Sequence, residues 1–272
     1  MLAFDDFDAL RRLVYDHSGL WLADSKVTFF TNHLSERLRA RGIASAREYY
    51  HYLKYDPHGH AELERLTEAL TIQETWFFRE TEPVEAWRVN LLPGLLKRAG
   101  QTVRVWSAAC STGEEPYTLA MMLCASEAHP SAFEIWATDI NPRAVEAARL
   151  ALYDPHSLRH TAAIWQARYF QRADDGRLRL ADEVKQMVRL GGGNLLDPSL
   201  GLRLDRMDLI LCRNVLIYFD ERSRQKALAN LYATLRPGGH LVLGLVETLA
   251  HAVSPFELAR VGKAFLYRKP TA

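Results

Sequence analysis

The amino-acid sequence predicts an α/β protein: a doubly wound, mostly parallel sheet, with a small N-terminal all-helical domain and a small antiparallel insertion. Up to about residue 75, apolar residues recur every three or four positions, as on the buried face of a helix. From about residue 102, short apolar runs alternate with helical stretches, which is the pattern of a parallel sheet covered on both faces. The length of 272 residues suits a small domain beside a larger one.

The N-terminal domain, placed at residues 1–75, is expected to contain only helices. Asp24 and Ser25 are suitable caps for a helix over 26–41, which Gly42 would end. Further helical patterns cover 46–55 and 61–70, on either side of a Pro/Gly turn. The first helix shows its buried face most clearly, in Phe4, Phe7, Leu10, Leu13 and Val14.

The second domain, placed at 102–272, is expected to follow a link at 76–101. Its strands are predicted from apolar runs at 103–108, 133–139, 208–214, 240–247 and 263–269. The helices between them are predicted at 114–126, 142–151 and 221–235. Two further runs, RLRL and VKQMVRL, predict the antiparallel insertion near 177–190.

Composition and charge exclude several classes of protein. The formal net charge of +1 offers no basic excess for a nucleic-acid partner. The three cysteines have no CxxC spacing, and His58 and His60 lack metal-ligand partners, so we expect neither disulfide nor metal. The acidic N-terminus is not a signal peptide, and no apolar run approaches the roughly 18 residues of a membrane span. We therefore expect a cytoplasmic protein without direct membrane insertion.

The segment after the first predicted strand, SAACSTGEEPY at 107–117, has the composition of a ligand-binding loop followed by a helix. Its small residues allow a ligand close to the main chain, while the absence of GxGxxG and GKT argues against a dinucleotide site or a P-loop. Glu114 and Glu115 would repel phosphate and suit a ligand with cationic groups and hydroxyls, such as S-adenosylmethionine. The alternative is helix capping, because Ser111 and Thr112 each precede a glutamate by three residues.

Asp139 ends the second predicted strand, where a ribose-binding carboxylate lies in dinucleotide folds. The alternative is that Asp139 only caps the next helix, which begins near Asn141 and Pro142. A polar loop after the first strand and an acid after the second together support a nucleoside-type ligand.

Six segments in order carry a resemblance to a known family. They are LTIQETWFFRE (70–80), VWSAACSTGEEPYTLA (105–120), ATDINPRAVEAA (137–148), GGNLLD (192–197), DLILCRNVLIYF (208–219) and RPGGHLVLGLVET (236–248). With them the chain resembles the CheR family of chemoreceptor methyltransferases, over nearly its whole length. The resemblance implies the sheet of the S-adenosylmethionine methyltransferase type, with S-adenosyl-L-methionine as cofactor and S-adenosyl-L-homocysteine as product.

The resemblance also implies a set of cofactor-binding residues: Gln73, Thr75, Arg79, Glu115, Asp139, Asn194, Leu195, Cys212 and Arg213. Within this set it places Asp139 on the ribose and the Asn194–Leu195 pair beside the adenine. Gln73 departs from the family, which usually has the shorter Asn at this position.

The resemblance further implies two catalytic residues, Arg79 and Tyr218, with the tyrosine near the transferred methyl group. Two alternatives stay open: Arg79 could pair with Glu80 or Glu82, and Tyr218 could be a buried tyrosine with a satisfied hydroxyl. Arg213 and Asn214 could likewise have only a structural role, at the end of the strand that precedes them.

The implied reaction is methyl transfer to glutamate side chains of chemoreceptors, giving glutamyl methyl esters for sensory adaptation. A glutamate carboxylate is ionised near neutral pH, so the reaction needs no general base. The enzyme mainly has to align nucleophile and methyl group, and such alignment contributes ~7–11 kcal/mol. A non-catalytic cofactor-binding scaffold, a methyltransferase for RNA or a small molecule, and the same chemistry in a non-motility pathway are the alternatives.

The implied partner is the cytoplasmic helical domain of chemoreceptors, and a receptor C-terminal tail peptide stays open as a second contact. A basic face on the helix at 26–41, made by Lys26, Arg37, Arg39 and Arg41, would suit the receptor's acidic methylation helices. The alternative is an ordinary solvated helix face.

Overall fold

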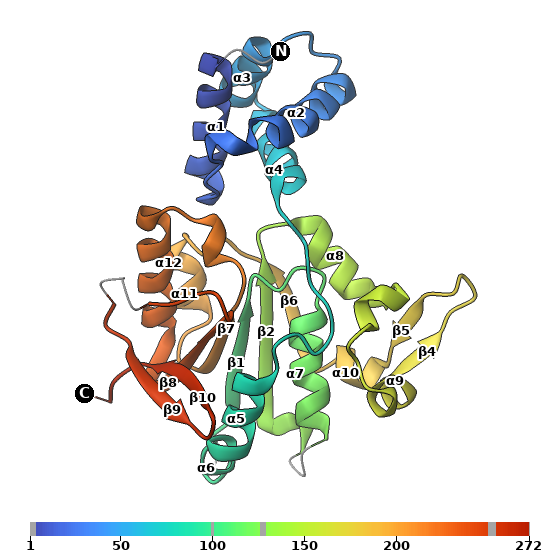
Figure 1. Ribbon diagram of the computed structural model, residues 1–272, viewed down its shortest axis with the longest axis vertical. Helices are drawn as coiled ribbons and strands as arrows, with labels where there is room; N and C mark the ends of the chain where they lie inside the picture. The colour runs from blue at the N-terminus through green and yellow to red at the C-terminus, as the bar shows by residue number, and fades with distance from the viewer. Residues whose placement is uncertain (1–3, 99–100, 126–128, 250–253, 272) are drawn as a thin grey trace. The chain divides into compact units, whose positions relative to one another are not determined.

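The computed structural model describes residues 4–98, 101–125, 129–249 and 254–271. The chain divides into two compact units (Figure 1). The first comprises Met1–Ile72 together with Ile217–Arg224, and the second comprises Gln73–Leu216 together with Gln225–Ala272. Among the helices that the structure describes, none is long and apolar enough to cross a membrane.

The first unit is helical, as predicted. Its elements are α1 (Phe4–Ser18), the short turn η1 (Asp24–Lys26), α2 (Val27–Arg41), α3 (Ala46–Tyr55) and α4 (Gly59–Leu70). Their apolar faces share one core, in which Phe7, Leu10 and Val14 of α1 are buried as expected. Gly42 adopts the left-handed conformation (φ 65°) and ends α2, as the sequence predicts.

A later segment of the chain, 217–224, also belongs to this unit. The amide of Trp21 donates to the carbonyl oxygen of Tyr218 at 3.0 Å, and the Tyr15 hydroxyl donates to Asp220 at 2.9 Å. Both contacts tie this segment to the end of α1 and the loop that follows.

The predicted basic face of the first unit is smaller than expected. Arg37 donates to both oxygens of Glu62 at 2.9 Å, and Arg41 lies 3.3 Å from the same carboxylate. Glu62 is almost fully buried and also accepts from the Tyr49 hydroxyl at 2.8 Å. Two of the four predicted cations are therefore engaged inside the unit, where Glu62 offsets one of their two positive charges, because a buried carboxylate needs a charged partner.

The second unit is built on a seven-stranded sheet in the order β6-β2-β1-β7-β8-β10-β9. The first five are parallel, while β10 runs antiparallel to both β8 and β9. In chain order the strands are β1 (Val103–Ala108), β2 (Phe133–Asp139), β6 (Val188–Gly192), β7 (Met207–Cys212), β8 (Leu235–Leu243), β9 (Glu257–Val261) and β10 (Ala264–Arg268). Every residue of β7 is buried, as in a central strand covered on both faces.

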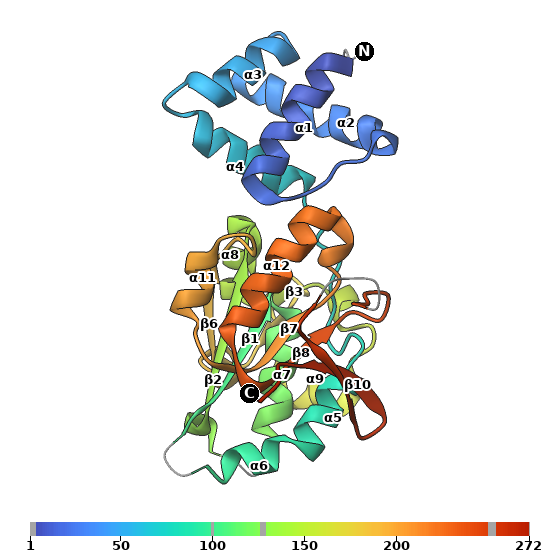
Figure 2. The ribbon, with the colours of Figure 1, turned by 90° about the vertical axis from the view of Figure 1, so that its left-hand side faces the viewer.

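Helices cover both faces of this sheet (Figures 1 and 2), which confirms the doubly wound α/β class. The α7 helix packs on β1 and β2, and α8 packs on β2 and β6. The helices that follow the parallel strands along the chain include α7 (Glu114–Cys124), α8 (Pro142–Leu150), α11 (Pro198–Arg203) and α12 (Glu221–Thr234). Residue 126, the predicted end of α7, lies outside the described residues.

The region expected to be a link, 76–101, is part of the second unit. It contains α5 (Glu82–Asn90) and α6 (Leu92–Leu96), and α5 packs on β9 and β10. Phe77, Val84 and Trp87 belong to the main hydrophobic core. The boundary between the units falls instead after Ile72, because these apolar side chains fill the core.

The antiparallel insertion is confirmed, but its bounds differ from the prediction near 177–190. Its strands are β3 (Leu152–Tyr153), β4 (Phe170–Arg172) and β5 (Leu178–Leu180), in the order β3-β5-β4. The second predicted run is split, since 182–185 forms α10 (Asp182–Lys185) and β6 pairs in parallel with β2. The short elements η2 (Pro130–Ala132), η3 (Pro155–Leu158), α9 (Ala163–Tyr169) and η4 (Leu216–Tyr218) complete the chain.

Candidate cofactor and active site

Four of the predicted site residues, Glu115, Asp139, Cys212 and Arg213, lie at the carboxyl ends of β1, β2 and β7. In an open α/β sheet this edge is where ligands bind, because the loops there leave main-chain groups unpaired. Ser107 and Ala108 end β1, Asp139 ends β2, and Arg213 directly follows β7.

The loop after β1 has an unusual main-chain conformation. Ala109, Ser111 and Gly113 all have positive φ, at 64°, 48° and 96°. At Gly113 a side chain would also collide, because a Cβ there would lie 2.9 Å from Cβ of Ala148. Ala109 and Ser111 carry a Cβ, which makes a positive φ unfavourable, whereas glycine adopts it readily. Non-glycine residues in this left-handed conformation cluster at functional sites. The Ser111 hydroxyl is buried without a hydrogen-bond partner among the described residues.

The predicted capping boxes are wrong. The residue before α7 is Gly113, and its left-handed main chain provides no side-chain cap. Thr112 instead donates to the Glu114 carboxyl group at 2.7 Å, and Ser157 donates to its other oxygen at 3.2 Å. Burial raises the pKa of Glu114, against the effect of these two hydrogen bonds. Glu114 therefore ties the loop to η3 and does not line an open site.

Glu115 faces the end of the sheet. Its carboxylate accepts from the Ser107 hydroxyl at 2.7 Å and from Nη1 of Arg213 at 3.0 Å. Ionised oxygens accept more than one hydrogen bond each, so both remain able to accept from a cationic ligand group. The predicted contact between Glu115 and the cofactor stays a prediction.

Asp139 joins the first two strand ends. Its Oδ2 accepts from the amide of Ser111 at 2.8 Å, and its Oδ1 accepts from the amide of Asn141 at 2.9 Å. Burial raises the pKa of Asp139, partly offset by these main-chain hydrogen bonds. The helix-capping alternative is wrong, because the Asn141 side chain caps α8 by accepting from Arg143 and Ala144. The carboxylate of Asp139 retains lone pairs that suit ribose hydroxyls.

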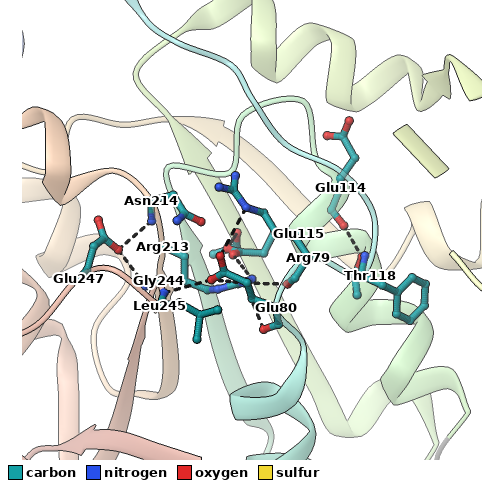
Figure 3. A network of polar contacts seen from close by, with 12 residues as sticks. Arg79, Glu80, Glu114, Glu115, Thr118, Arg213, Asn214, Gly244, Leu245 and Glu247 are labelled. Carbon is teal, nitrogen blue, oxygen red and sulfur yellow. Dashed lines mark hydrogen bonds and ion pairs between the residues drawn. The ribbon is translucent and has the colours of Figure 1, made fainter. Parts of the chain in front are cut away.

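Arg213 is the hub of the polar network in Figure 3, and its side chain is only 5% exposed. Beyond Glu115, its Nη2 donates to the carbonyl oxygens of Arg79 and Glu80, at 2.6 and 3.1 Å. The same nitrogen lies 3.3 Å from Oε2 of Glu80. Arg213 therefore does more than close β7, since it joins the 79–80 segment to the start of α7.

Arg79 lies on this segment with part of its guanidinium uncommitted. Its Nη1 donates to the carbonyl oxygen of Glu74 at 2.6 Å, and its guanidinium carbon lies 4.3 Å from the ring centre of Trp76. Its Nε is buried and has no hydrogen-bond partner in the part of the chain that the structure describes. The predicted pairing with Glu80 is present only as a contact of 3.9 Å.

Glu247 is a site residue that the sequence analysis missed. Its carboxylate accepts from the amides of Gly244, Asn214, Val215 and Leu216, at 2.8 to 3.0 Å. Figure 3 shows the contacts with Gly244 and Asn214. It thereby joins the loops after β7 and β8. The only available signal was an acid shortly after a predicted strand, which does not by itself reveal four amide partners.

The remaining predicted residues differ in burial and in their hydrogen bonds. Gln73 is exposed and Thr75 is half-buried. Leu195 is buried, and the Asn194 side chain accepts from the amide of Leu196 at 2.9 Å. Their contacts with the cofactor remain predictions.

The positions of two other predicted residues, Cys212 and Tyr218, do not by themselves support their predicted roles. Cys212 is fully buried, so the structure gives no support to a contact between its side chain and a cofactor. Tyr218 belongs to the first unit, whereas Arg79 belongs to the second, and their joint role remains a prediction.

The groups at this edge fit S-adenosylmethionine chemically. Asp139 offers a carboxylate for ribose hydroxyls, while Ser111 and Arg79 offer buried donors without partners. Glu115 offers a carboxylate that suits a cationic group. A parallel sheet extended by an antiparallel hairpin, with these groups at its carboxyl edge, fits the class of S-adenosylmethionine-dependent methyltransferases.

Comparison with known proteins gives the family. A model described as CheR methyltransferase, SAM binding domain, matches residues 73–265. A second, described as CheR methyltransferase, all-alpha domain, matches residues 5–71. The chain therefore belongs to the CheR methyltransferase family, and its cofactor is S-adenosylmethionine.

Its relatives are chemotaxis proteins. Chemotaxis protein methyltransferase 2 of Vibrio cholerae is 34% identical, over 97% of this chain and 93% of that protein. The chemotaxis protein methyltransferase of Escherichia coli is 34% identical over 94% and 90%, respectively. Among solved structures, the rRNA methyltransferase aviRa of Streptomyces viridochromogenes has a TM-score of 0.46 at 15% identity, covering 74% of this chain and 89% of that chain. That low likeness carries no argument about function.

Proposed function

We propose that the protein methylates glutamate side-chain carboxylates of chemoreceptors, as a protein-glutamate O-methyltransferase that serves sensory adaptation. The observation that carries this proposal is that Nε of Arg79 is buried and has no hydrogen-bond partner among the described residues, with Glu80 only at 3.9 Å. A buried guanidinium nitrogen without a hydrogen-bond partner, beside a cofactor site, suits an incoming carboxylate. The names of the relatives support the chemotaxis setting.

The chemistry needs orientation more than acid–base catalysis. Bound S-adenosylmethionine supplies an electrophilic methyl group on a sulfonium. A glutamate is already ionised near neutral pH, so no residue has to remove a proton. Asp139 holds the ribose in this scheme, and Arg79 orients a carboxylate. Placing nucleophile and methyl group in line contributes ~7–11 kcal/mol in comparable systems.

Two catalytic residues are proposed. Arg79 provides the cationic donor that removes water from the substrate carboxylate without protonating it. Tyr218 provides a phenolic group near the methyl group, as the family resemblance implies. Gln73, Thr75, Asn194, Leu195 and Arg213 complete the proposed cofactor site.

The proposed partner is the cytoplasmic helical domain of a chemoreceptor. With Arg37 and Arg41 paired to Glu62, Lys26 and Arg39 are the cations of the predicted basic face that remain for an acidic helix. A receptor C-terminal tail peptide is a second proposed contact.

The test incubates the full chain with methyl-labelled S-adenosylmethionine and a receptor cytoplasmic fragment, and then adds base. A glutamyl methyl ester releases volatile labelled methanol, whereas N- or C-methyl groups are retained. A fragment with alanine at its methyl-accepting glutamates is the matched control and should release none. Base-stable label would point to another methyl acceptor, and cofactor binding without label would point to a non-catalytic scaffold; either result refutes the proposal.

A further inference from the structure

Glu80 makes three contacts at the site, and neither the family resemblance nor the proposed function gives it a role. Its Oε2 accepts from the amide of Leu245 at 3.1 Å and lies 3.3 Å from Nη2 of Arg213. Its Oε1 lies 3.9 Å from Nε of Arg79. Its side chain is 20% exposed, so these contacts form in a partly desolvated setting where charge pairing is stronger than in water.

The main chain around Arg79 is held in an uncommon conformation. Phe78 and Glu80, on either side of Arg79, have positive φ, at 59° and 47°. Non-glycine residues adopt this conformation only where surrounding contacts impose it. The amide of Phe78 donates to the Thr118 hydroxyl at 3.0 Å, which holds one side of Arg79. Arg213 holds the other side through the carbonyl oxygen of Glu80.

The Glu80 carboxylate adds a link that the main chain lacks. Through Leu245 it connects the 79–80 segment to the loop after β8, as Figure 3 shows. Through Arg213 it connects the same segment to the end of β7 and to Glu115 of α7. One carboxylate therefore joins the segment that carries Arg79 to two strand ends.

The distance of 3.9 Å between Oε1 of Glu80 and Nε of Arg79 is too long for a hydrogen bond but short enough for charge attraction. At 3.9 Å, the carboxylate attracts the guanidinium without a hydrogen bond to Nε. The guanidinium is thereby oriented by charge, while Nε, which is buried, keeps its hydrogen without an acceptor among the described residues. A shorter ion pair would occupy it.

We propose that Glu80 is a positioning residue for methyl transfer, which acts by holding Arg79 in place for the substrate carboxylate. This inference rests on the proposed function of Arg79. Loss of the Glu80 carboxylate frees the segment from Leu245 and removes the charge that orients Nε. Methyl transfer then slows, while cofactor binding at Asp139 persists.

The test compares Glu80→Gly, Glu80→Ala and Glu80→Gln in the assay for base-labile methyl esters. Glycine fits a φ of 47°, so Glu80→Gly removes the carboxylate while relieving backbone strain, whereas Glu80→Ala keeps the strain. Glu82→Ala, an exposed acid in the same segment, is the matched control. Thermal unfolding and the affinity for S-adenosyl-L-homocysteine are measured for every variant.

We expect kcat to fall about 10- to 100-fold in both Glu80→Gly and Glu80→Ala, as displacement of a catalytic group by about 1 Å does. The affinity for S-adenosyl-L-homocysteine should stay within about twofold of the wild type in every variant. Glu80→Gln keeps an acceptor for the Leu245 amide, so its kcat should fall less than that of Glu80→Ala. In an Arg79→Ala background, Glu80→Ala should cost less than about twofold in kcat, because its effect acts through Arg79.

Two results overturn the inference alone while the wild-type protein forms the ester. One is full activity of Glu80→Gly, which would show that the carboxylate has no part. The other is an equal loss from Glu80→Ala with and without Arg79, which would show a merely structural effect. A wild-type protein that forms no base-labile ester overturns the proposed function, and this inference with it.

Discussion

The amide of Ser111 donates to Oδ2 of Asp139 at 2.8 Å, and this bond joins the loop after β1 to the end of β2. Ser111 has a φ of 48°, so the bond helps to hold a conformation that serine seldom adopts. The carboxylate of Asp139 thus shapes the loop, and we propose that its remaining lone pairs accept from the cofactor's ribose.

Asp139→Ala should weaken cofactor binding at least about tenfold while the fold persists, because it removes the acceptor for the ribose hydroxyls. Isothermal titration calorimetry with S-adenosyl-L-homocysteine measures this, and circular dichroism checks the fold. Asp182→Ala, which alters an exposed acid on α10, should leave the affinity unchanged. An Asp139→Ala variant with wild-type affinity would refute the ribose assignment.

Glu247→Ala should lower the free energy of unfolding by about 3 kcal/mol, because four main-chain amides at the ends of β7 and β8 lose a charged acceptor. Urea denaturation of the full chain measures the change. Glu146→Ala, at an exposed i,i+3 pair with Arg149, should cost less than about 0.5 kcal/mol. Equal costs for the two variants would contradict the assigned role of Glu247.

His240 should make the second unit less stable in mild acid. Burial, and to a lesser extent the charge of Arg268, lowers the pKa of His240 to about 4. Its folded-state pKa lies below the unfolded value of about 6.5, so its stabilising contribution is complete above pH ~6.5 and is lost as pH falls toward 4. By pH ~4.5 the loss should reach about 2–3 kcal/mol in the wild-type protein.

His240→Leu removes this titration, so its stability should fall less than that of the wild type over the same pH range. Urea midpoints measured between neutral pH and pH ~4.5 give the comparison. Parallel pH profiles for the two proteins would show that His240 does not titrate with a lowered pKa.

Glu62→Gln should destabilise the first unit by about 3–5 kcal/mol, because it leaves Arg37 without its buried charged partner. Hydrogen exchange of amides in α2, α3 and α4 isolates this unit from the second. Glu36→Gln, at an exposed acid 3.8 Å from His33, is the control and should leave exchange unchanged. Unaltered exchange in Glu62→Gln would show that the ion pair contributes little to stability.

Strands β1 and β2 were predicted best, and most of their residues are buried. β1 and β2 match their predicted bounds, because continuous apolar runs signal central parallel strands without reference to other parts of the chain. β9 was not predicted, since only the last of its five residues is buried. β6 was assigned to the wrong sheet, because its register with β2 depends on a pairing distant in sequence.

The candidate site could likewise be predicted only where the position of a residue follows from nearby sequence. Asp139 could be predicted because its place at a strand end follows from local sequence. Glu80 and Glu247 could not, since their partners lie 133 and 33 residues away in Arg213 and Asn214. α5 and α6 are short, so few apolar positions repeat along them, and their helical pattern was too weak to assign them to the second unit.

The most direct test of the proposed glutamate methylation is the mass of receptor peptides after reaction with the full chain and S-adenosylmethionine. We expect a mass increase of one methylene group on glutamate residues, lost again on brief treatment with mild base. The Arg79→Ala variant should give little of this product under the same conditions. A methyl group that resists base, or one found on another residue type, would contradict the assignment of glutamate as the methyl acceptor.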